Sequence, residues 1–325
     1  MSESIIYDAD DRHDVYAEPD PRLRAIAEQA TAAIVLRSEI AIDASGAVSL
    51  GATSAQDTYD LCADEPFAAQ PSAALCTAVL VAPDIALTAG HCLTWMSCPR
   101  LALVFGFNAP APDQLGPLHA SDVYGCAEVL ALEVSQPGVV PARDYGFVRL
   151  ERPVDAPRQP VQLTREPAPA AGTAVVAIGH GAGLPVKIAG NGLVTDSRAA
   201  TGDYFLANVD NYGAGSGSGV YDAHGRLIGL ATGGGADFAL APEGCSRSRH
   251  VAGDLAAGEK VGNLAPMLAG LCAEASASEL CGQHVPTSGC GVSDRRAVGH
   301  GGTLAALLVL VLASTWWCRR ARSGI

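Results

Sequence analysis

The sequence predicts an all-β domain, either a barrel or a sandwich, that covers most of the 325 residues. Between about residues 36 and 240, apolar runs of four to eight residues alternate with Gly, Pro, Asp and Asn, as in TAVLVAP, LALVFGF and GTAVVAIG. Gly (36) and Pro (20) are plentiful although 49% of the residues are hydrophobic, which is typical of a globular chain of short strands and turns. The sequence shows no internal repeat of 20–50 residues.

The two ends of the chain differ from this middle part. Residues 1–35 predict an N-terminal arm with an acidic start, and residues 258–271 predict a closing helix with Pro266 near its beginning. Residues 272–300 are polar and predict a linker. Residues 301–318 are apolar and are followed by a basic tail, 319–325. A membrane span takes about 17–25 residues, so this segment is short but sufficient, with a buried helix of the domain as the alternative.

Charge and cysteines limit the partners and the compartment. The formal net charge of −13 argues against nucleic acid as a partner, because phosphate binding needs clustered Lys and Arg. Eight of the ten cysteines precede the tail, and no CxxC pair favours zinc, so we expect disulfides, an oxidising compartment and no metal or other cofactor. The stretch MSESIIYDADDR has no basic or apolar region of a signal peptide. We therefore expect an exported protein whose natural start lies upstream of Met1.

A candidate general base lies at the end of a predicted hairpin. In CTAVLVAPDIALTAGHC (76–92), two apolar runs are separated by Ala-Pro-Asp, and the hairpin would bring Cys76 and Cys92 together. A disulfide there would fix the turn that holds His91, and proton transfer needs such fixing. Cys98 and Cys126 are a further predicted pair. The pairing of the remaining cysteines stays open, namely Cys62, Cys245, Cys272 and Cys281.

Two further motifs follow in the chain. Asp144 directly precedes a strand-like run in RDYGFVRLERPV, where an isolated Asp would be read as a turn residue. The Gly-Ser run 213–219 lies between YFLANVD and RLIGLATGGG, and by itself it could be a flexible loop. Ser216 is the candidate nucleophile there, with Ser218 as its rival.

These three motifs resemble those of chymotrypsin-like serine proteases, in particular a bacterial branch that contains glutamyl endopeptidases. LTAGHC resembles the catalytic-His motif, DYGFVRL the motif of the triad carboxylate, and Ser-Gly-Ser-Gly-Val the nucleophile motif. GHGAGLPVKIAG (179–190) is also similar to a stretch of the bacterial relatives. The chain order His91, Asp144, Ser216 is that of the chymotrypsin group.

The resemblance implies a fold and a reaction. The fold would be two six-stranded barrels, 36–155 and 156–257, with a C-terminal helix packed outside. The expected activity is that of a serine endopeptidase without cofactor, acting on a protein or peptide substrate through an acyl-enzyme. The backbone N–H groups of the segment Ala214–Gly215–Ser216 would form the oxyanion hole.

Besides Gly219, which replaces a Pro of the nucleophile motif, two departures from the family bear on activity. Ala214 stands where the family has Gly with a positive φ, so the hole could be distorted. Gly215 replaces the Asp that pairs with the new N-terminus in animal members, so that activation would follow another route. A protease homologue that binds peptides without cutting them is therefore the alternative function.

A few residues are expected to contact the substrate side chain. Asp210 lies six residues before Ser216, the spacing of the specificity Asp of trypsin, and would favour Arg or Lys; a plain turn residue is the alternative. Thr232, Gly233 and Gly234 would leave the pocket open. Glutamyl endopeptidases carry a His near this point, where this chain has Ala231 or Thr232, which argues against cleavage after Glu.

The C-terminal tail resembles the sorting tails of myxobacterial surface proteins. It contains Ser-Gly-Cys at 288–290, a spacer, the apolar segment and an Arg cluster. The resemblance implies that Cys290 is the functional residue of the motif and that the protein is displayed at the cell surface or secreted. We expect a monomer that contacts the membrane only through this tail.

Overall fold

A computed structural model describes residues 6–112, 114–135, 142–233, 237–252, 258–276 and 278–282. The chain divides into residues 1–285 and residues 286–325. The whole second part lies outside the described residues, and with it Cys290, the expected membrane segment 301–318 and the basic tail. Within the described residues, no helix is long and apolar enough to cross a membrane.

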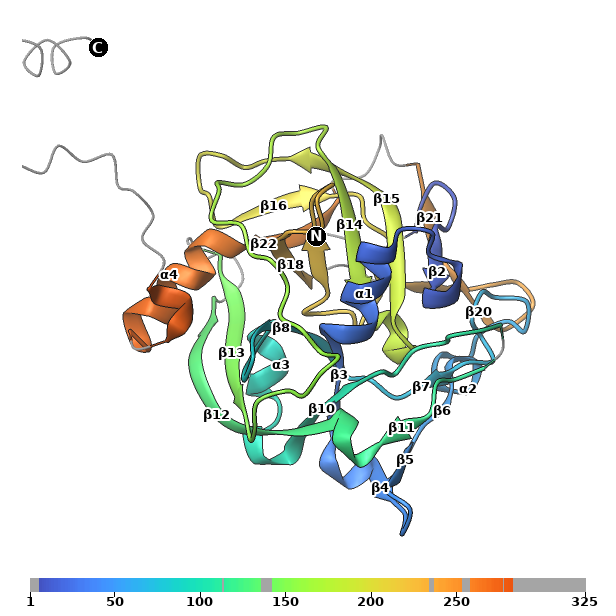
Figure 1. Cartoon of the computed structure of the whole chain (residues 1–325). Coiled ribbons are helices and arrows are strands. Elements are labelled where there is room, and N and C mark those ends of the chain that lie inside the picture. The colour runs from blue at the N-terminus through green and yellow to red at the C-terminus, as the bar shows by residue number, and fades with distance from the viewer. Residues whose placement is uncertain are drawn as a thin grey trace, which may run out of the picture. The chain divides into compact units, whose positions relative to one another are not determined.

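The first barrel is closed by six strands in the order β10-β12-β13-β9-β8-β3 (Figure 1). Its strands consist of apolar runs, and all seven residues of β8 are buried. Their bounds are β3 (Thr31–Leu36), β8 (Cys76–Ala82), β9 (Ile85–Thr88), β10 (Leu101–Phe105), β12 (Val123–Val134) and β13 (Asp144–Leu150).

The second barrel closes in the same way, because β14 pairs with both β17 and β15. The ring order is β14-β17-β18-β22-β16-β15, and β2 (Arg12–Asp14) adds to the outer edge of β15. The six strands are β14 (Ala174–Gly179), β15 (Lys187–Asp196), β16 (Tyr204–Ala207), β17 (Gly219–Tyr221), β18 (Leu227–Gly233) and β22 (Glu259–Asn263). The mainly β fold with two six-stranded barrels is thus confirmed.

Small sheets and four α-helices complete the described residues. The small sheets are β1 (Ile6–Tyr7) with β21 (His250–Val251), β4 (Ile40–Ile42) and β5 (Ala47–Leu50) with β11 (Leu118–His119), β6 (Thr53–Ser54) with β7 (Pro71–Ser72), and β19 (Phe238–Leu240) with β20 (Ser246–Ser248). The helices are α1 (Pro21–Gln29), α2 (Ala55–Tyr59), α3 (His91–Thr94) and α4 (Leu264–Glu274).

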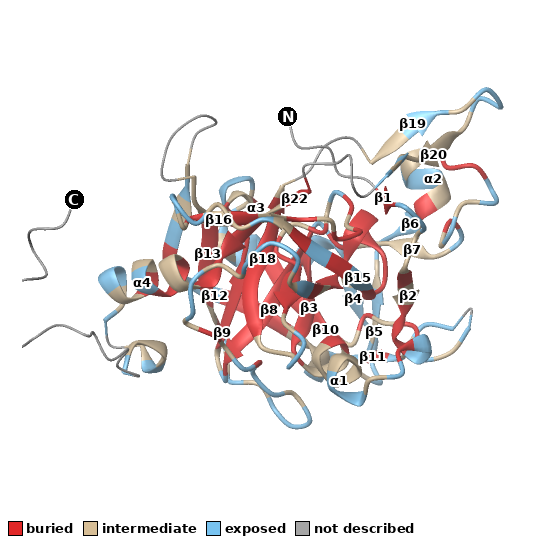
Figure 2. Cartoon of the chain, turned by 90° about the horizontal axis from the view of Figure 1, so that it is seen from above, coloured by how far each residue is buried: buried red, intermediate tan, exposed pale blue. Residues whose placement is uncertain are grey.

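The buried residues concentrate in the barrels (Figure 2). The largest apolar cluster fills the first barrel and continues into strands of the second through Ile178, Ile188 and Tyr221. A separate cluster, which includes Phe205 and Val261, fills the rest of the second barrel. The shared cluster joins the two barrels.

The N-terminal segment is not a separate arm. Ile6 is fully buried, β1 and β2 pair with strands of the second half, and β3 begins at Thr31 rather than after residue 35. Apolar side chains such as Val15 and Ala27 pack on the main core, which explains why this segment is ordered with the barrels. The first barrel therefore starts before the expected boundary at 36.

The closing segment also differs from the expected helix over 258–271. Glu259–Asn263 forms β22, which pairs with β16 and β18, so the second barrel extends past residue 257. The helix α4 begins at Leu264, and the side chain of its N-cap Asn263 accepts from the Ala265 N–H. Pro266 fits in the first turn because N–H groups there have no helical acceptor.

Candidate active site

His91 is fixed by one carboxylate at both its ring and its backbone. Asp144 begins β13, and its Oδ2 lies 2.7 Å from His91 Nδ1 while its Oδ1 accepts from the His91 N–H at 2.9 Å. With the proton on Nδ1, the other ring nitrogen, Nε2, is left as an acceptor. The imidazole is therefore held in one tautomer and one orientation, as a general base requires.

The residue before His91 must be glycine. A Cβ on Gly90 would lie 2.6 Å from the Glu133 carbonyl oxygen and 2.7 Å from the Tyr145 carbonyl oxygen. Backbone of β12 and β13 therefore approaches the turn too closely for Ala. This contact brings the start of α3 against β13, where Asp144 lies.

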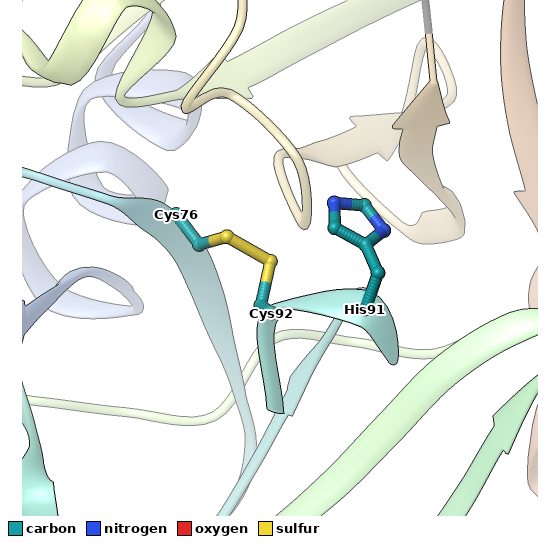
Figure 3. Close-up of side chains that lie close together, drawn as sticks. All are labelled: Cys76, His91 and Cys92. Atoms are coloured by element: carbon teal, nitrogen blue, oxygen red, sulfur yellow. A yellow bond between two sulfur atoms is a disulfide. The ribbon is translucent and has the colours of Figure 1, made fainter. Parts of the chain in front are cut away.

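A disulfide holds the same turn from the other side. Cys76 at the start of β8 is bonded to Cys92, the residue after His91, and Figure 3 shows the bond beside the imidazole. The ligand atoms of Cys76, His91 and Cys92 lie within 4.8 Å of one another, but the two sulfurs are bonded together and offer no thiolate to a metal. The predicted Cys76–Cys92 pair is confirmed.

Three other disulfides lie elsewhere in the described residues, between cysteines 9, 28 and 183 positions apart. Cys98–Cys126 matches the expectation for neighbouring strands. Cys62–Cys245 and Cys272–Cys281 resolve the pairing that the sequence left open. Cys62–Cys245 ties together residues 183 positions apart, a contact that no local pattern could predict.

Ser216 lies beside the Cys76–Cys92 disulfide. Its carbonyl oxygen accepts from the Thr77 N–H at 2.8 Å and lies 3.8 Å from Cys92 Sγ. The backbone of the nucleophile candidate is thus held by Thr77 of the first barrel and lies next to Cys92, the residue that follows His91. Ser218 is only 1% exposed, and its Oγ is 3.4 Å from Thr77 Oγ1, so burial argues against it as the nucleophile.

A tight turn, Tyr212–Gly215, directly precedes Ser216. The Gly215 N–H donates to the Tyr212 carbonyl at 2.8 Å, and Ala214 has φ +63°, which together define a type II turn. Holding Ala in this left-handed region costs roughly 1 kcal/mol. Among the described residues, no protein acceptor receives a hydrogen bond from the N–H of Ala214 or of Ser216. Neither N–H group is thus used in a hydrogen bond within the described residues.

Gly215 has no room for a side chain. A Cβ there would lie 2.0 Å from Asn211 Oδ1 and 2.6 Å from the Tyr212 carbonyl oxygen. The Asn211 amide therefore occupies the space that a carboxylate at position 215 would need. Support for this turn has to come from another part of the chain.

Asp210 does not act as expected. Its Oδ1 accepts from the Tyr7 N–H at 2.8 Å and its Oδ2 from the Asp11 N–H at 3.1 Å. The residue is 6% exposed, and burial, followed by the nearby Asp11 carboxylate, raises its pKa to about 7. Both oxygens are thus engaged by the N-terminal segment, and an Arg/Lys preference based on Asp210 loses its support.

A second buried acid was missed by sequence reasoning. Glu259, at the start of β22, is 1% exposed, and the Tyr7 hydroxyl lies 3.4 Å from its Oε1. Burial raises its pKa to about 9, and the charges of Asp237 and Asp210 add to this effect. Sequence reasoning missed Glu259 because it expected a helix over 258–271, in which an acidic residue of the first turn is ordinary. No other signal in the sequence marks this residue.

The remaining expected contact residues lie on or after β18. Thr232 is buried, and its hydroxyl donates weakly to the Lys260 carbonyl at 3.4 Å. A Cβ on Gly233 would meet nothing within 4 Å, so space is open above it. Gly234 lies outside the described residues. Burial lowers the pKa of Lys260, and attraction to Asp144 partly opposes this shift.

Comparisons with known proteins find one family model and several solved structures that are similar to this chain. Residues 76–230 match the family model of the trypsin-like peptidase domain. A solved Glu endopeptidase is similar in structure, with 13% identity and a TM-score of 0.49, covering 84% of this chain and all of that one. The VesB protease of Vibrio cholerae has 12% identity and a TM-score of 0.48, covering 80% of this chain and 64% of that one. No curated protein matches the sequence.

Proposed function

We propose that this chain is a serine endopeptidase that uses His91, Asp144 and Ser216. The observation that carries the proposal is the double contact of Asp144 with the ring and the backbone of His91, since this arrangement fixes an imidazole as a base. The match of residues 76–230 to a trypsin-like peptidase domain supports the same reaction class.

The proposed reaction is acyl transfer through a covalent intermediate. His91 Nε2 takes the proton of Ser216 Oγ as that oxygen attacks the peptide carbonyl carbon. The N–H groups of Ala214 and Ser216 stabilise the oxyanion of the tetrahedral intermediate. The imidazolium then protonates the leaving amine, and water activated by His91 hydrolyses the acyl-enzyme to release the second product and restore Ser216.

The experiment that tests the proposal is labelling by a fluorophosphonate probe, which reacts with activated serine hydroxyls. The full chain should be labelled, and Ser216→Ala should abolish the labelling. Ser218→Ala is the matched control, since it removes a neighbouring but buried hydroxyl and should leave labelling intact. Labelling that survives Ser216→Ala would contradict the assignment.

Absence of labelling in a folded, disulfide-bonded sample would instead support the alternative, a protease homologue that binds peptides without cutting them. The open space above Gly233 offers room for a substrate side chain in either case. We leave the preferred P1 residue open, because both oxygens of Asp210 are used within the protein.

We also propose that the protein is exported. The domain carries four disulfides, and such bonds persist mainly in oxidising compartments. Fractionation of producing cells, followed by alkylation of free thiols under denaturing conditions, tests this. Protein outside the cytoplasm with its eight domain cysteines protected is expected, and a cytoplasmic pool with reactive thiols would contradict it.

A further inference from the structure

The N-terminal segment Ile6–Asp14 is attached to the second half of the domain at two points. β1 pairs in parallel with β21, through Ile6 opposite His250. β2 pairs antiparallel with β15, through Asp14 opposite Lys187. The residues between these two pairings, 8–11, are therefore held at both ends and pass next to the segment that leads to Ser216.

Asp210, at the start of that segment, is bound by the backbone between the two pairings. The N–H groups of Tyr7 and Asp11 donate to its two carboxylate oxygens. These contacts fix the position of residue 210 relative to β1 and β2. They leave residues 211–215 to be fixed by other contacts.

Arg12 supplies the next contact, to Tyr212. The guanidinium carbon lies 3.8 Å from the centroid of the Tyr212 ring, and Nη2 donates to the Tyr212 hydroxyl at 3.2 Å. Asp10 aligns the guanidinium by accepting from Nε at 2.9 Å and from Nη2 at 2.7 Å. The Arg12 side chain is 4% exposed, so the stacking takes place away from water, where a cation on an aromatic ring is most favourable.

Tyr212 in turn carries the turn that presents Ala214. Its carbonyl accepts the Gly215 N–H that closes the type II turn, and Gly215 itself has no room for an anchoring side chain. The aromatic ring of Tyr212 is also packed edge-on against Phe238, at 4.9 Å between centroids. The position of the turn therefore depends on how the Tyr212 side chain is held.

We propose that Arg12 is a positioning residue that holds the oxyanion-hole turn through Tyr212. The segment Ile6–Arg12 thereby holds the turn from outside, because Gly215 has no room for a charged side chain that could anchor it. This inference rests on the proposed endopeptidase function for its kinetic consequence, but not for its structural one.

The kinetic consequence is specific to the transition state. The N–H groups of Ala214 and Ser216 contact an oxyanion that exists only after attack, so a displaced turn lowers kcat and leaves KM nearly unchanged. Removal of one oxyanion donor costs about 100- to 1000-fold in rate. Since Arg12 acts through Tyr212 and does not touch the substrate, we expect a loss of about 10- to 100-fold in kcat for Arg12→Gln.

The experiment compares three variants of the full chain with the wild type. Arg12→Gln removes the charge and the stacking, and Arg12→Lys keeps the charge but loses the planar contact with Tyr212. Arg22→Gln is the matched control, since Arg22 is exposed, belongs to the same N-terminal region and, within the described part of the chain, forms an ion pair only with Asp20. We expect the order wild type and Arg22→Gln, then Arg12→Lys, then Arg12→Gln, both in kcat on a peptide substrate and in the rate of fluorophosphonate labelling.

Hydrogen exchange gives a readout that needs no activity. Peptides that cover residues 210–216 should exchange faster in Arg12→Gln and Arg12→Lys than in the wild type, and Arg22→Gln should leave them unchanged. If the wild type is inactive, the proposed function fails while this measurement still decides on Arg12. If Arg12→Gln does not fold, Arg12→Lys and Tyr212→Phe, which keeps the ring but loses the hydroxyl contact, replace it.

Two results would overturn the proposal. One is an unchanged kcat in folded Arg12→Gln together with unchanged exchange over 210–216. The other is a loss confined to KM, or to thermal stability with normal kcat at low temperature, since both would mean that Arg12 only binds substrate or only stabilises the fold.

Discussion

Asp210→Asn should change how the stability of the domain depends on pH. The variant keeps the shape of the side chain but has no proton to lose. In the wild type, Asp210 is buried with both oxygens hydrogen-bonded to the N–H groups of Tyr7 and Asp11. The other charged groups that face it are Arg12 and the Asp11 carboxylate in the N-terminal segment and Glu259 on β22.

The sign and the size of the effect follow from the raised pKa. Burial shifts the pKa of Asp210 from 3.8 to about 7 in the folded protein. An acid with a raised pKa contributes stability that is fully present below its unfolded pKa and is lost as pH rises through its folded pKa. A shift of about three units, at 1.36 kcal/mol each, makes this loss about 4 kcal/mol between pH 4 and pH 8.

Urea unfolding under non-reducing conditions measures the difference. Both proteins carry Ser216→Ala to prevent autolysis, and unfolding is followed from pH 4 to pH 8. As pH rises, the free energy of unfolding of Asp210→Asn should increase relative to that of the protein with Asp210. Subtracting the two curves cancels the titration of all groups that the substitution leaves unchanged.

Asp222→Asn is the matched control with the opposite sign. Burial alone would raise the pKa of Asp222, but hydrogen bonds from Arg226 lower it overall. Its Asn variant should therefore lose stability, relative to the Asp222 protein, as pH rises through the acidic range. Parallel curves for Asp210→Asn and its parent over the whole range would refute the reasoning from burial.

Three further predictions concern other parts of the site. Glu259→Gln should become more stable relative to the wild type as pH rises from 5 to 9, because burial raises the pKa of Glu259 to about 9. Urea unfolding measures this, and a stability difference that does not change with pH would contradict it. Replacing Cys76 and Cys92 together by Ser should cost about 3 kcal/mol, since their disulfide closes a loop of 16 residues, and it should slow fluorophosphonate labelling; unchanged labelling would show that the bond does not hold His91. Ala214→Gly relieves roughly 1 kcal/mol of strain but adds a similar entropy to the unfolded chain, so unfolding should shift by less than about 1 kcal/mol and labelling should not slow; a tenfold slower labelling would contradict the turn described here.

The sequence predicts those parts of the site that depend on local patterns. The hairpin between Cys76 and Cys92 follows from the lengths of two apolar runs and the turn between them, and the structure contains both the hairpin and the disulfide. The position of Asp144 at the start of a strand could be predicted for the same reason. The positive φ of Ala214 is the conformation that the resemblance implied for this position.

What the sequence does not reveal are contacts between distant segments. Asp210 is bound by Tyr7, 203 residues away, and Glu259 by the same residue across 252 positions. No periodicity or motif in the sequence indicates either contact, because each forms only when the folded domain brings the N-terminal segment next to strands of the second barrel. A spacing of six residues before Ser216 is therefore insufficient to assign Asp210 to substrate binding.

The segment that carries Ser216, the proposed nucleophile, is held by contacts from both halves of the domain. Thr77, on a strand of the first barrel that begins with a disulfide-bonded cysteine, fixes the backbone at Ser216. The N-terminal segment fixes the other end, at Asp210 and Tyr212. Between these two supports lies the strained turn at Ala214, which neither a side chain at Gly215 nor the local sequence could hold by itself. The geometry of the Ala214 and Ser216 N–H groups, which we propose as the oxyanion donors, thus depends on both supports. We expect it to be lost wherever either support is loosened, even when His91 and Asp144 stay in place.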